Sequence, residues 1–79
     1  MERAEYLGYL RDALAVARDS RNAGVEVAAR LLLGQAVEGA EAGEQYELAI
    51  AVTGRTGDRR REHEARRLLA TLLWRSFPE

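Results

Sequence analysis

Histidine is the residue type best suited to metal binding and acid–base chemistry near neutral pH, and the chain holds only one. That residue, His63, lies between two carboxylates, Glu62 and Glu64. A metalloprotease helix needs a second histidine four residues further on, so that both rings share one face. Position 67 is Arg67 instead. We therefore interpret His63 as a solvated helix residue and predict no metal site.

Nucleophiles are equally scarce in this chain. It has no cysteine and two serines, Ser20 and Ser76, and neither lies in a Gly-x-Ser-x-Gly turn. The glycine-rich stretch 39–43 lies among glutamates, which would repel a phosphate. The glutamates at positions 41, 44 and 47 are not part of a twelve-residue calcium loop. We therefore expect no catalytic residues, no cofactor and no bound metal, and we predict that the protein is not an enzyme.

Arginine is the remaining residue type with binding chemistry, since the chain has twelve arginines, no lysine and thirteen acidic residues. The net charge of −1 argues against a general nucleic-acid binder. The charges are segregated, because residues 38–54 carry four Glu and no Arg, whereas residues 55–79 carry seven Arg against four acids. This asymmetry favours an acidic partner or head-to-tail stacking of subunits. Nucleic-acid contact is a weaker alternative, because acids at positions 58, 62 and 64 interleave with the arginines.

A length of 79 residues corresponds to one small domain, which we place at residues 1–79. A domain of this size buries about 60% of its unfolded surface, so a partner or self-association often adds stability. No apolar run approaches the roughly 18 residues that span a bilayer. The first residues carry no apolar signal region. The expectation is a cytoplasmic protein without membrane contact.

The commonest residue types predict the fold class. Fourteen Ala and eleven Leu occur together with many Arg and Glu, all of which favour helices. No stretch alternates apolar and polar residues as a strand would. The sole proline, Pro78, follows the last apolar residue and interrupts no helix. We predict an all-α fold of four helices, whose short connections make successive helices antiparallel.

Apolar stripes place the first two helices. We predict the first over residues 2–19, with a wide apolar face. The second, over residues 23–38, is apolar nearly all round, so it must lie between other elements or face a partner. The wide face of the first helix holds Tyr6, Leu7, Leu10 and Leu14.

Glycines and capping residues divide the rest of the chain. Gly39–Gly43 is predicted as a break, and the third helix follows it and ends between Gly54 and Gly57. Asn22 and Asp58 are suitable N-caps for the second and fourth helices.

The chain contains an internal repeat. Ala13–Ala17 matches Glu47–Ala51 at an offset of 34, Arg21 matches Arg55 at the same offset, and 28–32 matches 65–69 at an offset of 37. A period near 34 with two helices per unit is the tetratricopeptide spacing. The segment 46–51, the turn at Gly57-Asp58 and the segment 65–70 resemble a tetratricopeptide second helix that passes into the next first helix. The resemblance covers about residues 10 to 74.

This resemblance implies two stacked helical hairpins that serve as a non-enzymatic protein-interaction module, as part of a larger regulator. In that family the first helix of each unit lines the inner groove. Arg30, Arg66 and Arg67 would then lie near a bound acidic segment of a protein partner. Trp74, an aromatic residue of the type enriched at interfaces, is a further predicted partner contact.

A second interpretation from the residues stays open beside the first. The four helices would close into a four-helix bundle that assembles as a homodimer and brings together whatever is attached to it. The predicted self-association face is the apolar face of the first helix, with Tyr6, Leu7, Leu10 and Leu14.

Overall fold

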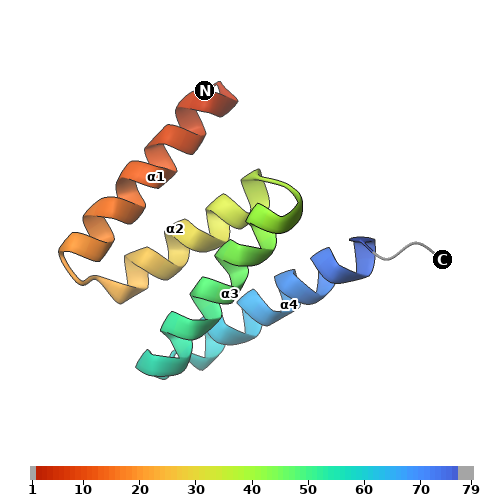
Figure 1. The fold of residues 1–79 in the computed structure, drawn as a ribbon. Helices are drawn as coiled ribbons and strands as arrows, with labels where there is room; N and C mark the ends of the chain where they lie inside the picture. The colour runs from red at the N-terminus through yellow and green to blue at the C-terminus, as the bar shows by residue number, and fades with distance from the viewer. Residues whose placement is uncertain (1, 77–79) are drawn as a thin grey trace.

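The computed structural model describes residues 2–76. Connections of two or three residues link the helices in this range. No strand occurs among the residues described, and the predicted all-α fold of four helices is confirmed. The helices are α1 (Arg3–Asp19), α2 (Ala23–Ala36), α3 (Gly39–Thr56) and α4 (Arg59–Ser76), as Figure 1 shows.

The helices form an open layer in which successive helices run in roughly opposite directions (Figure 1). The main interfaces join α1 to α2, α2 to α3, and α3 to α4. The Cα atoms extend over 44 × 34 × 16 Å, so the layer is thin in one direction. In a closed four-helix bundle, α1 would also pack on α4. Within residues 2–76 no comparable interface joins these two helices, and the arrangement is open rather than closed.

The helices α2, α3 and α4 share one apolar core, in which α3 is the central element. Its buried residues recur every three or four positions and therefore occupy a single face of the helix. Leucines of α4 pack against the same core. The buried members of this core are Val27, Leu31, Ala42, Tyr46, Ala49, Val52 and Ala65.

The helix α1 packs mainly on α2. Its two buried residues are Leu10 and Ala17, seven positions apart and so on one face. At its start, Arg3 Nη2 donates a hydrogen bond of 2.8 Å to the carbonyl of Ala36 at the end of α2. An exposed ion pair of 2.9 Å joins Arg11 to Glu41 of α3.

The predicted break at Gly39–Gly43 is wrong, because this segment forms the first turns of α3. The connection between α2 and α3 consists of Val37 and Glu38 alone. Ala42, within the segment, is 1% exposed in the shared core. Gly39 has a φ of 63°, a left-handed conformation that suits glycine. Burial of this face against α2 and α4 offsets the helical cost of Gly43, which is about 1 kcal/mol.

The turns after α1 and α3 have the same geometry, with residues 21 and 57 in equivalent places. Arg21 (φ 55°) and Gly57 (φ 77°) both adopt the left-handed conformation. The next residue donates its backbone N–H five residues back, from Asn22 to Ala17 O at 2.8 Å and from Asp58 to Thr53 O at 3.2 Å. Both turns are thus Schellman-type helix ends. The sequence match had paired Arg21 with Arg55, two residues away from this structural equivalence.

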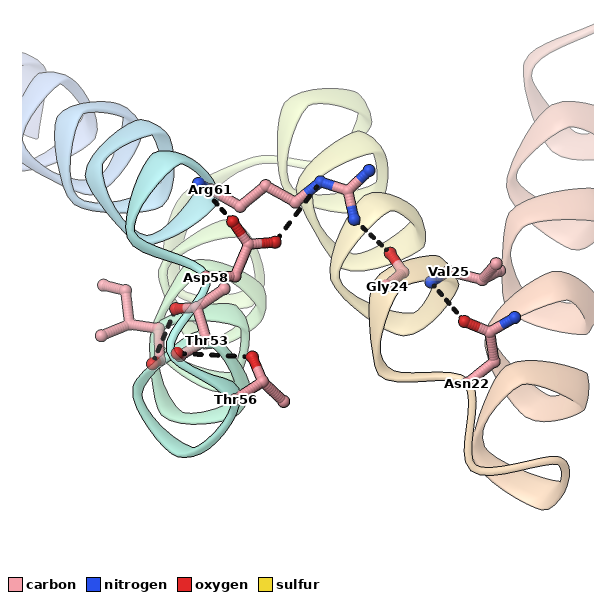
Figure 2. A network of polar contacts seen from close by, with 8 residues as sticks. Asn22, Gly24, Val25, Thr53, Thr56, Asp58 and Arg61 are labelled. Atoms are coloured by element: carbon pink, nitrogen blue, oxygen red, sulfur yellow. Dashed lines mark hydrogen bonds and ion pairs between the residues drawn. The ribbon is translucent and has the colours of Figure 1, made fainter.

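The residue after each left-handed position caps the next helix. Asn22 Oδ1 accepts the backbone N–H of Val25 at 3.1 Å, and Asp58 Oδ1 accepts that of Arg61 at 3.2 Å. Both predicted N-caps are therefore confirmed, and Figure 2 shows them together. Each satisfies one of the free donors at the start of its helix.

The α2–α3 crossing is close because α2 has a glycine at the contact. A Cβ atom at Gly34 would overlap the ring of Tyr46, at 2.8 Å from both Cδ1 and Cζ. Tyr46 is only 5% exposed, so its ring fills the space that a side chain at position 34 would need. The smallest residue on α2 thus receives the largest core side chain of α3.

We expect Gly34→Ala to lower the free energy of unfolding by about 1–3 kcal/mol, because the added methyl group must displace the packed ring. Urea unfolding followed by circular dichroism measures this change. Gly8→Ala is the matched control, because an added Cβ in α1 meets nothing within 4 Å. It should stabilise the chain by about 0.5–1 kcal/mol. Equal effects of the two variants would mean that the Gly34–Tyr46 contact does not control stability.

The two Schellman-type turns generate a reciprocal prediction. Arg21→Gly should raise the free energy of unfolding by about 0.5–1 kcal/mol, because glycine adopts the left-handed conformation without the Cβ clash. Gly57→Ala should lower it by about 1 kcal/mol for the same reason. Thermal unfolding of both variants tests the pair. A loss of stability in Arg21→Gly would show that the arginine side chain contributes more than its conformation costs.

Candidate functional site

A groove lies between the C-terminal halves of α2 and α4, and the start of α3 forms its floor. Its volume is about 550 Å³. We call it the α2–α4 groove. Its lining residues are Gly34, Gln35, Val37, Glu38, Gly39, Ala42, Tyr46, Arg67, Leu68, Thr71, Leu72 and Arg75.

Two arginines of α4 give the groove its positive charge. Arg67 and Arg75 are both exposed and are eight residues apart, which corresponds to about 12 Å along the helix. Glu38 is the only acid among the lining residues, so the lining has a net charge of +1. Leu68 and Leu72 lie between the arginines in sequence and supply an apolar surface. The groove therefore combines two separated cations with an apolar surface on the same helix.

Tyr46 of α3 adds a phenol to the lining of the groove. Burial raises the pKa of its phenol above the ordinary value of 10.0, while the positive charge of Arg75 acts in the opposite direction. The phenol is consequently protonated across the physiological range and can donate a hydrogen bond. A carboxylate in the groove would meet a donor of this kind beside the guanidinium groups.

Arg61 joins the N-terminal ends of α2 and α4, at the far end of these helices from the groove. Its Nη1 donates to the carbonyl of Gly24 in α2 at 2.9 Å, and its Nε lies 3.9 Å from Asp58 Oδ2 (Figure 2). Asp58 thus caps α4 with one carboxylate oxygen and pairs with Arg61 through the other. This contact links the N-terminal ends of the two helices whose other halves line the groove.

The structure separates the three arginines that we predicted to act together. Arg67 lines the α2–α4 groove, whereas Arg66 lines a different surface hollow of α4, together with His63. Arg66 donates to Glu62 Oε2 from Nε at 3.1 Å and from Nη2 at 2.9 Å. Consecutive residues of a helix point about 100° apart, so these neighbours face different surroundings.

Arg30 is not a groove residue. It is 6% exposed, and its guanidinium donates to Glu26 Oε2 at 2.9 Å and to Gln45 Oε1 at 3.1 Å. The bond to Gln45 joins α2 to α3, whereas the bond to Glu26 lies within α2. Arg30, predicted as a contact of an acidic segment, thus lies outside the α2–α4 groove lining and has partners within the chain.

Trp74 is the most exposed large apolar side chain among the residues described, with 80% of its surface accessible. It neighbours Arg75 in sequence but does not line the groove. Its neighbour Leu73 is 48% exposed. Trp74 therefore lies near the C-terminal end of the groove, where it is free to contact a bound segment.

The predicted self-association face is largely covered within the chain. Leu10 is 3% exposed, because this face of α1 packs on α2. Tyr6, Leu7 and Leu14 are half-buried. The exposed large apolar residues of α1 are instead Tyr9 and Val16, at 65% and 66% exposure.

Sequence reasoning missed Arg75 and Tyr46 as members of the site. Arg75 recurs on the face of Arg67 after eight residues, slightly more than two helical turns, so the helical period contained a signal for it. Tyr46 could not be assigned in this way, because its place in the groove depends on Gly34 of another helix.

Comparison with known proteins gives no relative: no family model, no curated protein and no solved structure matches the chain. Among residues 2–76, none of the helices has the length and the hydropathy needed to cross a membrane.

The raised pKa of Tyr46 predicts a pH dependence of stability. Above pH about 10 the unfolded chain releases the phenolic proton while the folded chain retains it, so the free energy of unfolding falls as pH rises. Tyr46→Phe should remove the part of the decrease in the free energy of unfolding that this phenol causes. Urea unfolding from neutral to alkaline pH measures the decrease. Tyr9→Phe on the exposed face of α1 controls for the loss of a phenol elsewhere. If Tyr46→Phe and the parent chain lose stability in parallel, the burial of the phenol has no such effect.

Proposed function

We propose that the chain is a non-enzymatic protein-interaction module of the helical-repeat type, and that it binds an acidic segment of a protein partner in the α2–α4 groove. The observation that carries this proposal is the lining of the groove. Arg67 and Arg75 supply two cations, Tyr46 supplies a donor, and leucines of α4 supply an apolar surface. Such a mixture orients an extended ligand through charge and retains it through apolar contact.

The helical-repeat part of the proposal is supported by the arrangement of the helices. Each helix packs mainly on its neighbours in the chain, as units of a repeat array do. The turn geometry at residues 21–22 recurs at residues 57–58. In the tetratricopeptide family the first helices of successive units line the inner groove, and α2 and α4 would be those helices here.

The spacing of the arginines specifies the ligand further. A span of about 12 Å along α4 equals the rise of three or four residues in an extended chain. A segment with two carboxylates about four residues apart could therefore pair with Arg67 and Arg75 together. An apolar residue between the carboxylates would meet Leu68 and Leu72.

Trp74 extends the proposed contact beyond the groove. Aromatic side chains are enriched among the residues that dominate binding energy, and this one is almost fully available. It is also the only tryptophan in the chain, so its fluorescence reports on a segment that binds nearby.

We predict that Arg67→Glu combined with Arg75→Glu weakens binding of a synthetic peptide, with two glutamates four residues apart around a leucine, by about tenfold or more. The reversed charges repel the carboxylates that the parent chain attracts. Titration of Trp74 fluorescence measures the affinity, and rising salt should weaken binding to the parent.

The matched control is Arg59→Glu combined with Arg60→Glu, which makes the same charge change at exposed positions of α4 outside the groove. This control should bind the peptide with an affinity close to that of the parent. Circular dichroism checks that both variants keep their helices. Equal binding by the groove variant and the parent, or equal loss in both variants, would contradict the proposal.

A further inference from the structure

A second cavity, of about 410 Å³, lies between the α1–α2 turn and α3. It shares no lining residue with the α2–α4 groove. We call it the arginine pocket. Four arginines from three helices and one turn line it, against a single acid. Ala23 of α2 and apolar residues of α3 form the rest of its surface. The charged lining residues are Arg18, Arg21, Glu26, Arg30 and Arg55.

The one acid of the pocket is already neutralised. Glu26 Oε2 accepts a hydrogen bond of 2.9 Å from Arg30 Nε, and both side chains are largely buried. Arg18, Arg21 and Arg55 are exposed. Within the described part of the chain, none of these three lies within 4 Å of a carboxylate. The pocket therefore has a surplus of three positive charges that no side chain balances.

The negative ends of the helix dipoles compensate only part of this surplus positive charge. Arg18 and Arg55 lie in the last turns of α1 and α3, where each helix dipole contributes about half a negative charge. Two such ends offset roughly one of the three surplus cations. Arg21 lies beyond the end of α1 and has no such compensation.

Arg21 also occupies a backbone position that suits glycine. Its φ of 55° is left-handed, whereas the equivalent position of the turn before α4 is Gly57. An arginine in that conformation is strained, and strained residues of this kind cluster at binding sites. The arginine at this position supplies a guanidinium to the lining of the pocket. A glycine at the same position would supply no positive charge.

We propose that the arginine pocket binds a ligand that carries a phosphate group, with two or more negative charges. Guanidinium groups pair with phosphate oxygens through two parallel hydrogen bonds, and three of them match the multiple charge of this group. The exposed apolar surface at Leu48 and Ala51 accommodates the carbon skeleton that bears the phosphate. This site is independent of the acidic-segment site in the α2–α4 groove.

Titration with inorganic pyrophosphate, at an ionic strength held constant with sodium chloride, tests the proposal. The expected result is a saturable rise in the melting temperature of the parent chain and shifts of the Arg18, Arg21 and Arg55 side-chain NMR signals. Arg21→Gly and Arg55→Gln should each weaken pyrophosphate binding by about fivefold or more. Because Arg21→Gly relieves the left-handed strain, it separates loss of binding from loss of folding.

Two controls exclude general charge effects. Arg59→Gln removes an exposed arginine outside the pocket and should bind pyrophosphate as the parent does. The double variant Arg67→Glu with Arg75→Glu should also keep pyrophosphate binding, even where it loses the acidic peptide. The two binding measurements therefore show separately whether the arginine pocket and the α2–α4 groove bind their ligands.

A phosphoserine tetrapeptide without other charged side chains identifies the source of the phosphate. Tighter binding of this peptide than of pyrophosphate indicates a phosphorylated protein, and the reverse order indicates a small molecule. Either order supports the phosphate site, provided that Arg21→Gly weakens both. No saturable response to either probe, or a response that Arg21→Gly and Arg55→Gln leave unchanged, overturns the proposal.

Discussion

The packing of Tyr46 against Gly34 is the contact on which the rest of the molecule depends. It brings α2 and α3 together at the point where a ring from one helix occupies the space of an absent side chain on the other. The same residue is part of the core that α4 joins, and it also lines the α2–α4 groove. One aromatic residue therefore links the stability of the layer to the polarity of its groove. A larger residue at position 34 would disturb both at once, because the core leaves little free volume.

The thinness of the layer determines what kind of sites the chain can build. An open layer of four helices has too little depth to enclose a buried cavity, so its polar groups converge in surface grooves between alternate helices. The helices α2 and α4 run parallel, so their corresponding ends lie side by side across α3 and form the α2–α4 groove. The arginine pocket forms where the end of α1 approaches α3. The two sites consequently use different residues, and each can bind or fail without the other.

The sequence predicts the helices well because local chemistry determines them. Asn22 and Asp58 accept backbone donors in their own turns, so residue identity was enough to assign them as caps. The start of α3 could not be predicted in this way, because Ala42 becomes buried only once α2 and α4 surround it. Which arginines line the same cavity could not be predicted from the sequence either. It depends on helix phase and on partners from other helices, such as Gln45 for Arg30.

A local feature of the sequence explains why two of the arginines carry no free charge. Arg30 and Arg66 each have a glutamate four residues earlier, and both form an ion pair with it at 2.9 Å. A carboxylate at that spacing lies on the same helical face and fixes the guanidinium in place. The cavity arginines without such a glutamate make no ion pair within residues 2–76, and their charge remains available to a ligand. Because an arginine retains its charge at all physiological pH values, a chain of net charge −1 can in this way present two locally basic sites. The arginines that line these two sites without an ion pair in the described part of the chain are Arg18, Arg21, Arg55, Arg67 and Arg75.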